Sequence, residues 1–302
     1  MSEKVFLNDK LIDIDGAQVS VRDIGLLYGV GLFETMRSCN GVVFSLADHL
    51  DRLFFSAQSL NIKISYTKEQ IADAVYETLR ANDLSDARLR LTLTGGTMSR
   101  EETERKNTLL VTATQFSPYP EQYYQNGATV VLCSFKQNPS DPVSGHKSTN
   151  YLPRMLALDM ARQKSAAEAL WFTIDNRLAE GCISNVFLVK SSVVYTPPVE
   201  TPVLAGVARK SVCQIAIHNS IQLIEKNLYI SDLLEADEVF LTNVIMQILP
   251  VTHIEAHVVG DGKVGAVTKR LGVLFENFVR QSCNRKTNNK KPKSKQRKTA
   301  KK

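Results

Sequence analysis

Long apolar runs are missing from this sequence of 302 residues, and so is any sign of an N-terminal targeting segment. No stretch approaches the roughly 20 consecutive apolar residues that cross a membrane. The N-terminal residues, MSEKVFLNDKLIDIDG, carry acids and lysines in place of the apolar core of a signal peptide. We therefore expect a cytoplasmic protein with no membrane partner.

Cysteine and histidine are few, and neither falls in a familiar ligand pattern. The five cysteines are an odd number, widely spaced and without a Cys-x-x-Cys pair, so we expect neither a disulfide framework nor a zinc site. His253 and His257 are four residues apart, but their surroundings are rich in β-branched residues and glycine, which does not favour a helix. We predict no metal site. A P-loop and a Gly-x-Gly-x-x-Gly after a strand are also absent.

Positive charge is concentrated at the C-terminal end. Residues 284–302 contain ten Lys or Arg and no acid, whereas the rest of the chain has 27 basic and 31 acidic residues, a net charge of −4. The formal charge of +6 is therefore a property of this tail. We predict a disordered, solubilising tail. The alternative, from another class of function, is salt-sensitive nucleic-acid binding through the tail.

Apolar periodicity predicts an α/β (α+β) protein with two domains, residues 1–118 and residues 119–283, divided near Pro118-Tyr119-Pro120. The first has expected helices over 46–60 and 68–82, and expected strands over 5–7, 11–14, 32–37, 42–45, 88–94 and 109–114. The second has expected helices over 152–164, 206–217 and 264–281, and expected strands over 129–135, 170–174, 186–189, 193–196, 239–242 and 251–254. Its many short strands favour a mixed sheet or pseudobarrel over a doubly wound sheet.

Two charged residues suggest a cofactor site. Lys147 follows Gly145-His146, and the glycine lets the backbone bend and expose the amine. Glu180 stands beside Gly181 between two expected strands. Taken alone, these are typical of a loop lysine and a turn glutamate. Taken together, they match an amine that forms a Schiff base and a carboxylate that keeps a pyridine nitrogen protonated.

A cofactor phosphate needs fixed donors, and the sequence offers several. Gly206, Val207 and Ala208 open an expected helix, whose free amides and positive dipole end attract an anion. Thr242 follows an expected strand and adds a hydroxyl. Arg52, on the helix over 46–60, adds a guanidinium, although an arginine on a helix most often faces solvent.

These stretches resemble the class IV aminotransferases, the fold-type IV pyridoxal-phosphate enzymes. The match runs in family order from about residue 4 to 280 and is carried by Tyr28-Gly-x-Gly-x-Phe33-Glu34, His49-x-x-Arg52-Leu53, Lys147-x-x-Asn150-Tyr151, Glu180-Gly-x-x-x-Asn185-Val-Phe187, Thr196-Pro-Pro, Leu204-x-Gly206-Val-x-Arg209 and Ala236-Asp-Glu-Val-Phe-Leu-Thr242-Asn243. One such motif is weak, whereas seven in order are specific.

The resemblance implies a small α/β domain, a larger pseudobarrel domain and a homodimer. It implies pyridoxal 5′-phosphate as cofactor, with Lys147 as the catalytic Schiff-base lysine and Glu180 as the partner of the pyridine nitrogen. By position, the phosphate falls to Arg52, Gly206, the amides of Val207 and Ala208, and Thr242. Tyr151 would lie near the cofactor ring, and the substrate side would be lined by Tyr28, Phe33 and Arg90.

The resemblance also has departures. Ala208 stands where many members have Thr, and Ile24 where many have Arg. The strand that ends at 94–97 lacks the arginine with which D-amino acid aminotransferases hold a carboxylate. We predict an aminotransferase that moves an amino group between a small, branched-chain-like amino acid and a 2-oxo acid. The alternative is an aminodeoxychorismate lyase, which forms 4-aminobenzoate and pyruvate in folate synthesis; residues 241–251 look more like the lyases.

Overall fold

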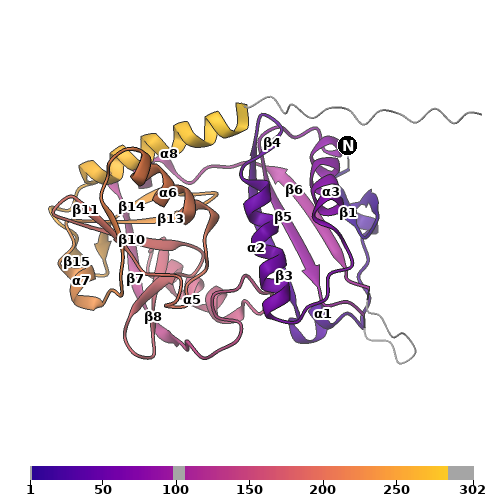
Figure 1. The fold of residues 1–302 in the computed structure, drawn as a ribbon, viewed down its shortest axis with the longest axis horizontal. Helices are drawn as coiled ribbons and strands as arrows, with labels where there is room; N and C mark the ends of the chain where they lie inside the picture. The colour runs from indigo at the N-terminus through magenta and orange to yellow at the C-terminus, as the bar shows by residue number, and fades with distance from the viewer. Residues whose placement is uncertain (1, 98–105, 285–302) are drawn as a thin grey trace, which may run out of the picture.

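The chain builds two separate β-sheets in a computed structural model that describes residues 2–97 and 106–284 (Figure 1). Apart from Asn284, the expected basic tail lies outside these residues. The first sheet has the order β2-β1-β6-β5-β3-β4. Its strands are β1 (Lys4–Leu7), β2 (Lys10–Asp13), β3 (Gly31–Cys39), β4 (Val42–Val43), β5 (Ala87–Thr94) and β6 (Leu109–Gln115).

Helices α2 (Leu46–Ser59) and α3 (Lys68–Ala81) pack on the first sheet because its strands alternate in burial. On β5, Leu89 and Leu91 are completely buried against the helices, whereas Arg88 and Arg90 are exposed and point to the other face. Thr67 caps α3 in a capping box with Gln70. The face of the sheet that the helices leave open is thus lined by arginine.

The second sheet has nine strands in the order β12-β11-β10-β13-β14-β7-β8-β9, with β15 paired to β14. They are β7 (Ala128–Gln137), β8 (Glu168–Thr173), β9 (Leu178–Gly181), β10 (Asn185–Lys190), β11 (Val193–Thr196), β12 (Leu223–Glu225), β13 (Glu238–Asn243), β14 (Gln247–Ile254) and β15 (His257–Val258). Parallel and antiparallel pairs are mixed, as the short predicted strands suggested.

Five helices accompany the second sheet: α4 (Glu121–Asn126), α5 (Leu152–Gln163), α6 (Val207–His218), α7 (Ile230–Leu234) and α8 (Ala266–Asn284). Helix α8 reaches back to the first sheet (Figure 1), where Phe275 packs on Phe44 with ring centroids 6.2 Å apart. No helix in the described part of the chain has the length and apolar character to span a bilayer. The described residues also contain no group of three or more His, Cys, Asp or Glu side chains placed to hold a metal.

The structure differs from the sequence-based expectations at several short elements. The glycine-rich segment contains a helix, α1 (Ile24–Tyr28), which Asp23 caps by accepting from the Gly25 amide and which Gly29 ends at a φ of 68°. Glu180 lies inside strand β9 and not in a turn. The expected return strand over 42–45 is only Val42–Val43, because Ser45 already takes a left-handed conformation ahead of α2.

Candidate active site

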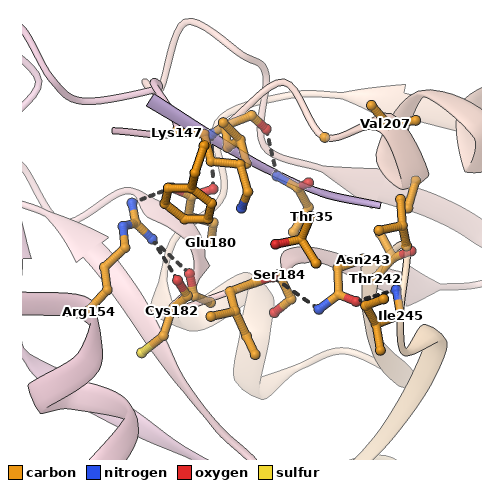
Figure 2. A pocket seen from close by; sticks show the side chains of 18 of the residues that line it. Thr35, Lys147, Arg154, Glu180, Cys182, Ser184, Val207, Thr242, Asn243 and Ile245 are labelled. Carbon is orange, nitrogen blue, oxygen red and sulfur yellow. Dashed lines mark hydrogen bonds and ion pairs between the residues drawn. The ribbon is translucent and has the colours of Figure 1, made fainter. Parts of the chain in front are cut away.

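A cavity of about 400 Å³ lies where the open face of the first sheet meets the second sheet (Figure 2). This volume suits a small cofactor with its substrate. Most of the sequence-predicted site residues line the cavity: Phe33, Arg52, Arg90, Lys147, Tyr151, Glu180, Gly206, Val207, Ala208 and Thr242. Tyr28 is not among the residues that line it, and at the end of α1 this residue is 66% exposed. In a single chain, Tyr28 is therefore apart from the residues with which the resemblance groups it.

Lys147 is held in the cavity by backbone pairing with β3. Its carbonyl accepts from the Phe33 amide at 2.9 Å, and the Thr149 amide donates to Gly31 at 2.8 Å. The amine nitrogen, Nζ, lies 4.5 Å from the centroid of the Phe33 ring and 5.9 Å from that of Tyr151. Burial, together with the positive charge of Arg52, lowers the pKa of Lys147 to about 7. The amine is therefore ready to act as a nucleophile near neutral pH.

Tyr151 fixes the wall beside this lysine. Its hydroxyl donates to the carbonyl of Cys182 at 2.7 Å, and its ring meets Phe33 edge-on with centroids 5.1 Å apart. Burial raises the pKa of Tyr151, so the phenol stays protonated and keeps donating at neutral pH. Phe33 and Tyr151 thus form an aromatic surface against which a flat ring could stack.

Glu180 supplies a buried carboxylate to the same cavity. Its side chain is 3% exposed, and its Oε2 accepts from the Leu204 amide at 2.9 Å. Its Oε1 accepts from the guanidinium of Arg154 at 2.5 Å. Arg154 also lines the cavity, and no sequence pattern singles it out, because an arginine in the first turn of a helix is commonplace.

The other end of the cavity is suited to an anion. Gly206 precedes α6, and no side chain caps the first amides of this helix. A β-carbon on Gly206 would fall 2.0 Å from Oδ1 of Asn185. Only glycine therefore lets the backbone at residue 206 pass this close to the Asn185 side chain. Thr242 pairs with Asn185 across β13 and β10. Its hydroxyl is buried and finds no hydrogen-bond partner among the described residues, which fits a donor kept for a ligand.

The guanidinium of Arg52 donates its hydrogen bonds to other residues of the protein. Its Nε and one terminal nitrogen donate to Glu34 at 2.8 and 2.5 Å, and the other donates to the Ala205 carbonyl at 3.0 Å. Burial alone would raise the pKa of Glu34, but the charge of Arg52 and the contact with His49 lower it to about 2. This buried ion pair fixes Arg52 beside the start of α6. Glu34 and His49 belong to the matched motifs, yet no role was predicted for them.

The lowered pKa of Lys147 predicts an unusual pH profile for its reactivity. In the ligand-free protein, reductive methylation of Lys147 should rise with pH through a midpoint near pH 7, because only the neutral amine attacks the aldehyde. Lys190, whose pKa is raised by its hydrogen bond to Glu235, should react only at much higher pH. Mass spectrometry of peptides labelled over a pH series measures both. Equal midpoints for the two lysines would contradict the prediction.

Comparison with known proteins agrees with this geometry. The family model for amino-transferase class IV matches residues 31–254, more than half of the chain. A protein of Methanocaldococcus jannaschii, provisionally named a branched-chain-amino-acid aminotransferase, is 39% identical over 91% of this chain and 96% of its own length. The D-alanine aminotransferase of Bacillus licheniformis is 32% identical over 91% of this chain and 97% of its own.

Solved structures extend the likeness to the whole fold. Branched-chain amino acid aminotransferase of Escherichia coli superposes with a TM-score of 0.88 at 25% identity and covers 95% of this chain and 98% of that one. The T.th. enzyme of the same name, solved with pyridoxamine 5′-phosphate, reaches 0.86 at 25% identity over 93% and 95%. A provisionally named 4-amino-4-deoxychorismate lyase of Legionella pneumophila reaches 0.79 at 25% identity over 86% and 95%.

These matches confirm the mixed α/β fold and the resemblance that the motifs suggested. Family model, relatives and solved structures agree, and the matched region contains Lys147, Glu180 and the start of α6. The aminotransferase activity predicted from the sequence is that of these homologues, and a lyase remains a related activity. The chain belongs to the class IV aminotransferases.

Proposed function

We propose that this chain binds pyridoxal 5′-phosphate on Lys147 and moves an amino group between a small, branched-chain-like amino acid and a 2-oxo acid. The observation that carries the proposal is one cavity with a half-buried lysine of lowered pKa, a buried carboxylate and an uncapped helix start. These are the three groups that the aldehyde, the ring nitrogen and the phosphate of this cofactor require.

The residues present fit the cofactor. The phosphate would be held by the Val207 and Ala208 amides and by the Thr242 hydroxyl, which has no hydrogen-bond partner within the described parts of the chain. Arg52 would add positive charge beside it, since one of its terminal nitrogens already reaches the carbonyl of Ala205. Ala208 offers its amide but no hydroxyl, which leaves Thr242 to supply the hydroxyl of this set.

Lys147 would also do the proton chemistry. When bound, the cofactor supplies an electron-withdrawing ring that stabilises negative charge at the substrate α-carbon. Lys147, once its amine is free, would take the proton from that carbon and deliver it to the cofactor. A pKa of about 7 lets the amine accept and release a proton near neutral pH. Glu180 would hold the proton on the ring nitrogen.

Arg90 and Phe33 would face the substrate. The guanidinium carbon of Arg90 lies 3.5 Å from the centroid of the Phe33 ring. Within the described residues Arg90 has no acidic partner, and its side-chain hydrogen bond goes to Thr92. A substrate carboxylate would supply the missing charge. Tyr28 would join the substrate side only if the assembled protein brings it there.

A second copy of this chain is proposed to cover the apolar surface near the cavity. Large apolar side chains are exposed on α1 and at the start of α5, namely Leu26, Leu27, Tyr28, Leu152, Met155 and Leu156. Met155 also lines the cavity. Such clustered exposure is typical of an interface, which supports the expected homodimer. We also propose a cytoplasmic location for the protein and a division of the chain into domains 1–118 and 119–283.

The lyase is retained as the second candidate because of the Legionella pneumophila neighbour. Nucleic-acid binding through residues 284–302 has no support from the comparisons and is not proposed.

The aminotransferase and the lyase differ in what they do to the bound cofactor. A transaminase needs an amino acceptor to complete its cycle, whereas the lyase releases pyruvate without one.

An absorbance experiment tests the proposal. The purified protein with added pyridoxal 5′-phosphate should show a visible band, and L- or D-amino acids that are substrates should bleach it in the absence of a 2-oxo acid. A branched-chain amino acid is the expected best donor. A protein that gains no band, and that borohydride does not tag at Lys147, would refute the cofactor assignment. Pyruvate released from aminodeoxychorismate without an acceptor would favour the lyase.

A further inference from the structure

Arg154 is placed by the protein backbone, and its charge is directed at one carboxylate. It lies in the first turn of α5, where Pro153 fits the start of a helix. One terminal nitrogen donates to the Gly181 carbonyl at 3.0 Å and lies 3.4 Å from that of Cys182. The other donates to Glu180 at 2.5 Å. Figure 2 shows the guanidinium bridging the Glu180 carboxylate and the backbone of β9.

A second buried carboxylate nearby, Glu168, forms no ion pair with any described residue. Glu168 is completely buried and accepts from the amides of Cys182 and Ile183 and from the hydroxyl of Ser184. All of these donors are neutral. Burial raises the pKa of Glu168 despite them, which favours its protonated form. Neutral donors therefore do not offset the loss of water around the Glu168 carboxylate.

Glu180 differs from Glu168 in having a positively charged partner, the guanidinium of Arg154. Burial alone would lower the pKa of Arg154, but the charge of Glu180 raises it, so the guanidinium stays charged. Each carboxylate offers about four lone-pair sites. Leu204 and Arg154 use one on each oxygen. No other described residue hydrogen-bonds to the remaining sites of Glu180, whose carboxylate lines the cavity.

We propose that Arg154 is a positioning residue that keeps Glu180 ionised and fixed in the cavity, ready to accept a hydrogen bond from a protonated ring nitrogen. The last clause rests on the proposed function, whereas the ionised, fixed carboxylate does not. Arg154 touches no reacting atom in this scheme and acts only through Glu180. No motif that suggested the family includes Arg154, so the pairing comes from the tertiary structure alone.

The test compares the urea unfolding of the full-length protein with that of single and double variants of Arg154 and Glu180. Arg154→Met keeps the side-chain bulk but leaves Glu180 buried without a counter-charge, so this carboxyl should hold its proton to higher pH in the folded state. Stability is then lost as pH rises, because the unfolded chain releases that proton more easily. The fall in urea midpoint relative to wild type should at least double between about pH 5 and about pH 8.

Removing the carboxylate should relieve this loss. Arg154→Met with Glu180→Gln is expected to unfold at higher urea than Arg154→Met alone at about pH 8, and Arg154→Lys should stay close to wild type. The matched control is Arg209→Met, which removes a buried guanidinium whose partner, Glu225, is 43% exposed. Glu180→Gln should not rescue that variant.

Each outcome decides the proposal. A pH-independent loss in Arg154→Met, unrelieved by Glu180→Gln, means that Arg154 only packs and overturns it. If Arg154→Met fails to fold but the double variant folds, the charge is the cause and the proposal stands. If neither folds, packing is the cause and the proposal fails. Borohydride tagging of wild-type Lys147 tests the cofactor assignment separately, so the two failures are distinguishable.

Discussion

Replacement of Lys147 with alanine is expected to lower aminotransferase activity by roughly a thousand-fold or more. The variant loses both the amine that would hold the cofactor and the base that would move the substrate proton. Because Lys147 is half-buried with a pKa lowered to about 7, removing its charge should not destabilise the fold. The measurements are the rate with a branched-chain amino acid and a 2-oxo acid, and the mass of the borohydride-reduced protein, which should lack the cofactor adduct.

Lys190→Ala serves as the control for this variant. Lys190 is exposed, and its one ion pair within the described structure is with Glu235 on the surface, so its loss should leave both the rate and the adduct unchanged. A Lys147→Ala protein that still gains the reduced adduct, or that turns over within a factor of about ten of wild type, would show that another lysine holds the cofactor.

Replacement of Glu180 with glutamine is expected to lower kcat by roughly a hundred-fold while the cofactor stays bound. Glutamine preserves shape and can still accept from Leu204 and Arg154, but it carries no negative charge to hold a proton on the ring nitrogen. The effect should fall on kcat more than on KM, since the charge matters most when the substrate α-carbon loses its proton. Steady-state rates and cofactor content measured together separate catalysis from binding.

Glu235→Gln is the matched control, because Glu235 is a surface carboxylate whose partner is Lys190. It should keep wild-type kcat and cofactor content. If Glu180→Gln also kept wild-type kcat, a charged partner for the ring nitrogen would be unnecessary. The proposed division of roles between Lys147 and Glu180 would then be wrong.

Much of the fold could be predicted where apolar residues recur at regular spacing along the chain. The alternation in residues 88–94 predicted strand β5, and the apolar spacing in residues 68–82 predicted α3. Short elements with only a few residues to carry a pattern were missed or misplaced. Helix α1 depends on Asp23, whose carboxylate also accepts from Thr94 and Thr108 far along the chain, and no local pattern reveals such contacts.

The candidate site was also predictable in part, but from residue identity and not from periodicity. Lys147, Glu180 and the start of α6 stand in short motifs, so their positions along the chain carry a signal. Arg52 was expected to face a phosphate, yet two of its three guanidinium nitrogens bind Glu34. Nothing in the spacing of residues 34 and 52 shows that their side chains form a buried ion pair, because β3 and α2 meet only in the folded domain.

The order of motifs by itself determined the family, the cofactor lysine to test and the mixed α/β class, because these depend on residue identity at fixed spacing. Tertiary structure alone decided which charges meet. It paired Arg154 with Glu180, tied Arg52 to Glu34 and left the Thr242 hydroxyl without a partner among the described residues. It also left Tyr28 exposed at the end of α1. Side-chain charges are matched across elements that are distant in sequence, and the free energy of each match depends on burial that only the packed structure creates.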